Sequence, residues 1–90
     1  MGKEVVLFTS EERTDVQHVS EFLHKLADKV ASREVTLRKG AEELTLQLPR
    51  NVVLEVKAEE EMKQSGPKRS LEIEIEWVEG QQDDGPLTLG

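Results

Sequence analysis

Carboxylate side chains on two alternating stretches are the groups of this chain best suited to binding a ligand. Glutamate alternates with apolar residues in residues 71–79, and a similar alternation runs through residues 52–58 and leads into Glu59. Alternation at period two places the apolar side chains on one face of a strand and the polar side chains on the other. On the polar side, the candidate interaction face comprises Val53, Glu55, Glu59, Glu72, Glu76 and Val78.

Like-charged pairs are expected on this acidic face. The strand register derived below sets Glu59 opposite Glu72 and Glu55 opposite Glu76, and such pairs destabilise a sheet unless a cation lies nearby. The four glutamates therefore suit a weak divalent-cation site or a docking surface for a basic protein. A solvated acidic face that keeps the sheet soluble explains the same residues without any ligand, and for these four glutamates we favour it over the cation site and over the docking surface.

A small apolar spot accompanies the acidic residues. In the same register Val53 and Val78 point outward and face each other beside Gln47. A partner protein, a second copy of the chain, or Leu87 and Leu89 near the C-terminus would cover them, although single exposed valines are also common.

Residue types that support catalysis or tight metal binding are scarce. His18 and His24 are six positions apart, so they lie on different sides of a helix and cannot ligate one metal ion together. The chain has no Cys, no Tyr, no Gly-rich phosphate loop and no triad-like spacing of Ser, His and acid. Trp77 is able to stack on a ligand, but its place on the apolar face of residues 71–79 favours a core position. We therefore predict no enzyme activity, no cofactor, and no catalytic or metal-ligating residues.

Length and charge restrict the class of protein further. Ninety residues suffice for one small domain, and 19 acidic against 12 basic residues give a formal charge of -7. This charge argues against nucleic acid as a partner, because phosphates require clustered Lys and Arg. The short apolar run in residues 5–8 is too brief for a signal peptide or a membrane span, which predicts a cytoplasmic protein without a membrane partner.

Periodicity predicts one helix and five strands. Apolar residues recur at spacings of three and four from Val16 to Val30, and Thr14 with Gln17 matches a capping box, so a helix is expected from Asp15 to near Ser32. Strands are expected at residues 4–9, 35–38, 43–48, 52–58 and 71–79.

Three turns define the register of the last four strands. Gly40 with Ala41 fits a two-residue turn that pairs Leu37 with Leu44 and Arg38 with Glu43. Residues 49–51 fit a three-residue loop, with Asn51 in a left-handed conformation, that pairs strands 43–48 and 52–58. A loop at residues 64–67 then pairs strand 52–58 with strand 71–79. The following positions are expected to face each other in the last two hairpins: Leu46 and Leu54, Glu43 and Lys57, Val56 and Ile75, Leu54 and Trp77, Lys57 and Glu74.

The predicted fold is therefore α+β, with a mostly antiparallel sheet in the order β-α-β-β-β-β and one amphipathic helix packed on its apolar face. Residues 1–79 are expected to form a single domain, and residues 80–90 a flexible tail. Two positions remain open for the first strand: parallel beside residues 35–38 through a right-handed crossover, or at the far edge beside residues 71–78.

The order of these elements resembles the amphi-Trp domain family, a group of short prokaryotic domains. The resemblance rests on residues 7–12, 26–29, 35–37, 48–49 and 54–59, and on the amphipathic strand of residues 71–77 that ends in Trp77. It implies a small α+β domain and no known activity, cofactor or catalytic residue. Together, the residues and the resemblance predict a non-catalytic binding or protein-interaction module, as a monomer or weak dimer. The alternative is a structural or stabilising protein with a weak divalent-cation site on the acidic strand face.

Overall fold

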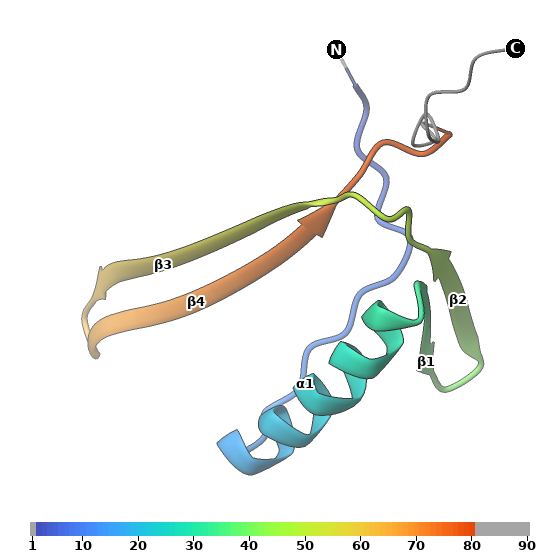
Figure 1. Ribbon diagram of the computed structural model, residues 1–90. Coiled ribbons are helices and arrows are strands. Elements are labelled where there is room, and N and C mark those ends of the chain that lie inside the picture. Colours follow the sequence, from blue (N-terminus) through green and yellow to red (C-terminus); the bar gives the residue numbers. More distant parts are fainter. Residues whose placement is uncertain (1, 81–90) are drawn as a thin grey trace, which may run out of the picture. The chain divides into compact units, whose positions relative to one another are not determined.

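The computed structural model describes residues 2–80, in which one helix is followed by four strands (Figure 1). The elements are α1 Val16–Ala31, β1 Glu34–Lys39, β2 Glu42–Gln47, β3 Val53–Lys63 and β4 Gly66–Glu76. The strands form two antiparallel two-stranded sheets, β1 with β2 and β3 with β4. The chain divides into two compact units, Met1–Leu48 and Pro49–Gly90. The predicted α+β class is confirmed.

Helix α1 begins one residue later than predicted, and its cap differs from the expected one. Asp15 is the N-cap, and its Oδ1 accepts a hydrogen bond of 2.8 Å from the backbone N–H of His18. Asp is as good an N-cap as Thr, and its position one residue farther along the chain displaces the predicted Thr14 capping box. The helix ends at Ala31 with Ser32 as the C-cap, as expected. None of the helices in residues 2–80 is long and apolar enough to cross a membrane.

The β1–β2 hairpin has the register that the sequence predicts. Leu37 pairs with Leu44 and Arg38 with Glu43, and the Arg38 Nε lies 3.2 Å from Glu43 Oε2. Gly40 has a φ of 58°, in the left-handed region that a glycine adopts easily, as expected at the first position of this tight turn.

The first unit has a small core where α1 contacts β1 (Figure 1). Val35 and Leu48 are buried, with exposed fractions of 6% and 5%, and they are the buried apolar side chains of the described residues. Leu26 and Val30 on α1 are half-buried, whereas Phe22 toward the start of the helix is 51% exposed. The C-terminal half of the helical stripe is therefore the better-covered half within this unit.

Arg33 and Leu48 join the end of α1 to the end of β2. The backbone N–H of Leu48 donates to the Arg33 carbonyl at 2.8 Å, and the Arg33 Nε donates to the Leu48 carbonyl at 2.8 Å. Arg33 adopts a φ of 66°, which a residue with a side chain seldom takes, immediately after the C-cap of α1. The two hydrogen bonds hold Arg33 in this conformation.

The β3–β4 hairpin has a register two residues away from the predicted one. Leu54 pairs with Ile75, Val56 with Ile73, and Lys57 with Glu72. The chain turns within residues 64–65, so that Lys63 pairs with Gly66, whereas the prediction assigned all of residues 64–67 to the loop. A slip of two residues preserves the face of every side chain, because the period of a strand is two.

The predicted four-stranded sheet is wrong, because β2 does not pair with β3. Leu48 instead continues the β1–β2 pairing by one position through its hydrogen bonds with Arg33. Asn51 is not among the residues with a left-handed conformation, so the expected three-residue loop does not form. The predicted pairs of Leu46 with Leu54 and of Glu43 with Lys57 are therefore absent.

The predicted strand at residues 4–9 is also wrong, since residues 2–14 contain no helix or strand. Val5, Val6 and Leu7 are 70%, 77% and 67% exposed. An apolar run becomes a strand only when a neighbouring strand satisfies its backbone groups, and none of the described strands pairs with it. The predicted tail, including Leu87 and Leu89, lies at residues 80–90 and so almost entirely outside the described residues.

Candidate functional site

The β3–β4 hairpin presents two faces of opposite character. We call Leu54, Val56, Ala58, Leu71, Ile73 and Ile75 the apolar face, because the register places them on one side of the hairpin. The opposite side, which we call the charged face, carries Val53, Glu55, Lys57, Glu59, Glu61, Lys63, Lys68, Ser70, Glu72, Glu74 and Glu76. The candidate interaction residues of β3 and β4 predicted from the sequence all lie on the charged face.

The apolar face is open to solvent. Leu54 is 64% exposed, Val56 61%, Leu71 70% and Ile73 56%, while Ile75 is half-buried. Residues 49–80 contain the two strands and no helix, so the second unit provides no second layer to cover these side chains. An isolated two-stranded hairpin is marginally stable in water, and packing on an apolar face is what normally stabilises it.

Lys57 organises the centre of the charged face. Its Nζ lies 2.6 Å from Glu59 Oε1 and 3.6 Å from Glu72 Oε2. The hydrogen bond and the charge of Glu59, followed by the charge of Glu72, raise the pKa of Lys57 above its ordinary value. The predicted contact of Glu59 with Glu72 is wrong, because Glu59 pairs with Ser70 and Lys57 takes the position opposite Glu72. These two carboxylates are therefore neutralised in part by the protein itself.

Three other carboxylates gather at the end of the charged face nearest Trp77. Glu55 pairs with Glu74, and Glu76 follows two residues later on the same side of β4. The charge of Glu74, its hydrogen bond with Glu76, and smaller effects of burial and Glu55 raise the pKa of Glu76. The predicted pair of Glu55 with Glu76 is wrong, since Glu76 pairs with Val53.

The geometry does not assemble the four glutamates of the predicted cation site. Lys57 lies among Glu55, Glu59 and Glu72 on the charged face, so a positive side chain already occupies the centre of the group. Within the described part of the chain, no group of three or more His, Cys, Asp and Glu side chains is arranged to hold a metal ion.

The predicted apolar spot of Val53 and Val78 does not form. Val53 pairs with Glu76, and Val78 lies beyond the end of β4. Both side chains are well exposed, at 57% and 62%. In the predicted register Val53 faced Val78. The observed register is shifted by two residues, so Val53 faces Glu76 and the two valines are separated.

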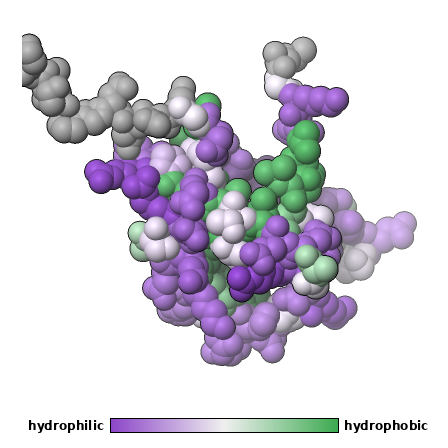
Figure 2. Space-filling model, turned by 90° about the vertical axis from the view of Figure 1, so that its right-hand side faces the viewer, coloured by the Kyte–Doolittle hydropathy of each residue, from purple (hydrophilic) through white to green (hydrophobic). Residues whose placement is uncertain are grey.

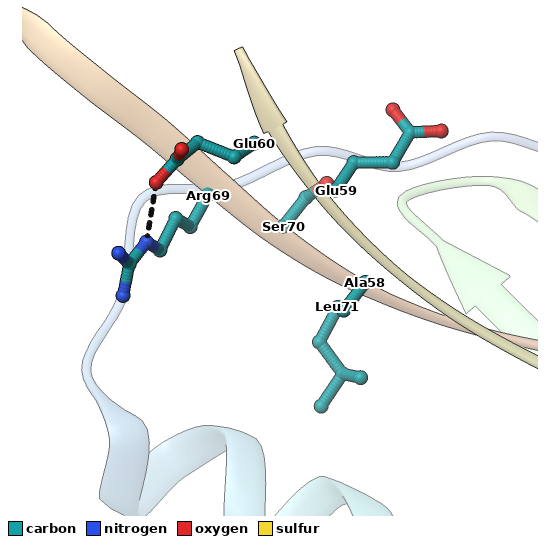
Figure 3. Close-up of a pocket in the computed structure, with 6 residues that line it drawn as sticks. All are labelled: Ala58, Glu59, Glu60, Arg69, Ser70 and Leu71. Carbon is teal, nitrogen blue, oxygen red and sulfur yellow. Dashed lines mark hydrogen bonds and ion pairs between the residues drawn. The ribbon is translucent and has the colours of Figure 1, made fainter.

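Glu60 and Arg69 form a charged pair that sequence reasoning missed. They face each other one row beyond Ala58 and Leu71 on the same side as the apolar face, with Arg69 Nε 2.9 Å from Glu60 Oε1 (Figure 3). Residues 58–60 and 69–71 line an open hollow of about 590 Å³. No signal in the sequence indicated this pair, because Glu60 faces Arg69 only with the two-residue turn at residues 64–65 that the structure shows.

Trp77 and the histidines occupy ordinary positions. Trp77 is half-buried, one residue beyond β4, and its indole N–H donates to Glu79 Oε2 at 3.2 Å. It is not opposite Leu54, as predicted, because Leu54 pairs with Ile75. His18 Nε2 lies 3.2 Å from Glu12 Oε1 on the surface. None of these groups is directed into the hollow on the hairpin, whose lining comes from β3 and β4 alone.

Hydrophilic residues cover most of the surface shown in Figure 2, in keeping with the formal charge of -7. Hydrophobic residues gather in one region of that view (Figure 2).

Comparison with known proteins gives one result. The chain matches the model of the Amphi-Trp domain over residues 1–90. Neither the curated proteins nor the solved structures contain a match. Since the family model spans the whole chain and the amphipathic strand before Trp77 is present as expected, the protein belongs to the Amphi-Trp domain family.

Proposed function

We propose that this protein is a non-catalytic protein-interaction module that binds its partner through the apolar face of the β3–β4 hairpin. The observation that carries the proposal is the open apolar face itself: Leu54, Val56, Leu71 and Ile73 are all more than half exposed on one side of a regular hairpin. Contiguous exposed apolar side chains rimmed by polar residues are typical of protein-binding surfaces.

Burial of this face supplies a driving force for binding. Full burial of a Val, Leu or Ile side chain contributes about 1.5–3 kcal/mol, so covering side chains that are already partly sheltered contributes about 1 kcal/mol each or more. Leu54, Val56, Leu71 and Ile73 together then contribute roughly 4–6 kcal/mol before the costs of association. The same contact stabilises the hairpin, because it provides the second layer that two strands lack.

The charged face has a different role in this proposal. Its carboxylates outnumber its lysines, so it keeps the hairpin soluble and discourages pairing through the wrong side. The interaction residues predicted from the sequence, such as Val53 and Glu55, belong to this face. An experiment that tests the apolar face must therefore also distinguish it from the charged face as a binding surface.

Two matched substitutions provide the test. Val56→Glu and Val53→Glu introduce the same side chain three residues apart on one strand, at positions 61% and 57% exposed, but on opposite faces. Tagged native protein and both variants are drawn from the cells of origin, and retained proteins are identified by mass spectrometry. We expect a near-stoichiometric partner to remain with the native chain and Val53→Glu and to be lost from Val56→Glu. Loss from Val53→Glu alone would assign binding to the charged face, and equal retention by both variants would exclude the hairpin.

A further inference from the structure

We propose that the partner of the apolar face is a second copy of this chain, with two hairpins packed face to face about a two-fold axis. This inference rests on the proposed function, because it requires the apolar face to be the binding surface. It adds the identity of the occupant and the symmetry of the contact. The result is a two-layer β-sandwich in which each hairpin covers the other.

Charge is the first argument for a second copy. In an isologous contact each surface meets itself, so a face with charges of one sign repels its copy. The charged face carries six glutamates and three lysines, an excess of three negative charges. On the side of the apolar face the strands carry one glutamate and one arginine, Glu60 and Arg69, directly opposite each other. Contact through this side of the hairpin therefore brings no excess of like charge into the interface, although each chain has a formal charge of -7.

The arrangement of Glu60 and Arg69 is the second argument. Both lie in one row at one end of the apolar face, next to the pair of Ala58 and Leu71 (Figure 3). The proposed two-fold axis lies between the two apolar faces, parallel to the cross-strand rows and level with the middle row. It brings each charged row over the opposite end of the other copy, so no glutamate is stacked on a glutamate. The ion pair is already formed within one hairpin, with an Nε to Oε1 distance of 2.9 Å, which lowers the cost of placing it at the rim of an interface.

The shape of the hairpin is the third argument. The apolar face has three successive cross-strand rows, Leu54 with Ile75, Val56 with Ile73, and Ala58 with Leu71. With the middle row on the axis, the first row of one copy lies over the third row of the other. Sheets packed in this way are about 10 Å apart, a spacing that Leu, Ile and Val side chains fill from both sides. The small Ala58 side chain lies opposite the larger Leu54 of the copy, which suits interdigitation.

Sedimentation equilibrium of the full chain over a wide concentration range tests the inference. The native protein is expected to dimerise. Val56→Glu places two carboxylates at the centre of the contact and should raise the dissociation constant by about a hundredfold or more, as the loss of an interface hot spot does. Val53→Glu, on the charged face, should change it by less than about threefold. Circular dichroism of each variant confirms that the fold is retained.

A charge exchange provides a readout specific to a self-complementary contact. Val56→Glu places a carboxylate of each copy in the row on the axis, and Val56→Lys places an ammonium of each copy there. Each variant alone should dimerise more weakly than the native chain, and an equimolar mixture should form a heterodimer. A mixture that associates no better than the separate variants would overturn the two-fold contact.

The outcomes separate this inference from the proposed function. A native chain that remains monomeric at all concentrations overturns the second copy as partner. If such a monomer still retains another protein in a manner that Val56→Glu abolishes, the proposed function stands without the dimer. A monomer whose binding ignores both Val56→Glu and Val53→Glu overturns both proposals.

Discussion

Leu48→Ala should destabilise the first unit strongly, because Leu48 is one of two buried apolar side chains among the described residues. Its exposed fraction is 5%, and within residues 2–80 only Val35, at 6%, is buried to a similar degree. Replacement of a buried Leu by Ala costs about 2–5 kcal/mol, and a site in so small a core belongs near the middle of this range, at about 3 kcal/mol. The hydrogen bonds between Leu48 and Arg33 that involve the backbone of Leu48 are unaffected, since Ala has the same backbone.

The size of this effect relative to total stability makes the prediction sharp. A unit of this length has roughly 2–7 kcal/mol of unfolding free energy, so a loss of about 3 kcal/mol removes a large share of it. Urea denaturation followed by circular dichroism at the helix signal is the assay, because α1 belongs to this unit. With a slope of about 1 kcal/mol per molar urea, the midpoint should fall by about 3 M.

Leu7→Ala is the control for this experiment. Leu7 belongs to the same unit, but it is 67% exposed and outside every helix and strand. The same chemical change there should alter the free energy of unfolding by less than about 0.5 kcal/mol. Equal shifts for Leu48→Ala and Leu7→Ala would refute the conclusion that Leu48 belongs to a core.

Three further predictions concern the β3–β4 hairpin. Glu76→Gln should raise the free energy of unfolding at neutral pH, because it removes a charge that Glu74 and Glu55 repel; the raised pKa of Glu76 means that this repulsion is lost as the pH falls. In urea titrations at several pH values, the stability advantage of Glu76→Gln should therefore shrink as the pH falls through the raised pKa of Glu76 and vanish below pH 4.5. An advantage that grows in acid would contradict this prediction. Glu59→Gln, which removes the carboxylate nearest the Lys57 ammonium, should have the opposite sign at neutral pH. Gly66→Ala should destabilise the hairpin by about 1–3 kcal/mol, since Gly66 has a φ of 121° that L-residues avoid; no atom lies within 4 Å of an added Cβ, so the cost is one of backbone conformation. Ser65→Ala is the control, and equal melting temperatures for the two variants would contradict the assignment.

Local patterns predicted the elements well where one face is apolar and a turn is short. The stripe along α1 and the Gly40 turn determine their structures through neighbours in the sequence, and both were found as expected. The paired alternation of residues 53–58 and 71–76 likewise predicted which side chains share a face. Backbone sterics and the period of two are sufficient for such features.

The extent of β3 and β4 could not be read from alternation. Beyond Ala58 the hairpin carries charges on both sides, with Glu60 and Arg69 on the side of the apolar face, so the pattern fades although the ladder continues to Lys63. The turn is consequently two residues long, with Gly66 and Pro67 inside β4. Pro is acceptable there because each strand of a two-stranded sheet is an edge strand.

The sequence did not predict how segments distant along the chain are arranged, for a different reason. The predicted sheet joined β2 to β3 because a hydrophobic pattern indicates only that a strand needs a partner. The position of Leu48 depends instead on Arg33, whose left-handed backbone and side-chain hydrogen bond no periodicity reports. The candidate site changed accordingly, since the glutamate pairs depend on register while the apolar face does not.

The pairing of each strand with its neighbour in the sequence has a consequence for the order of folding. The most distant partners in the ladders are Val53 and Glu76, and α1, β1–β2 and β3–β4 are each formed by one continuous segment. Helices form in about 1 μs and hairpins in about 1–10 μs, and low contact order favours rapid folding. During synthesis each segment can begin to form its local structure as soon as it emerges, although a hairpin becomes stable only once its apolar face is covered. For the proposed dimer, association of two chains is then the slow step, and the rate of the final folding phase should rise with protein concentration.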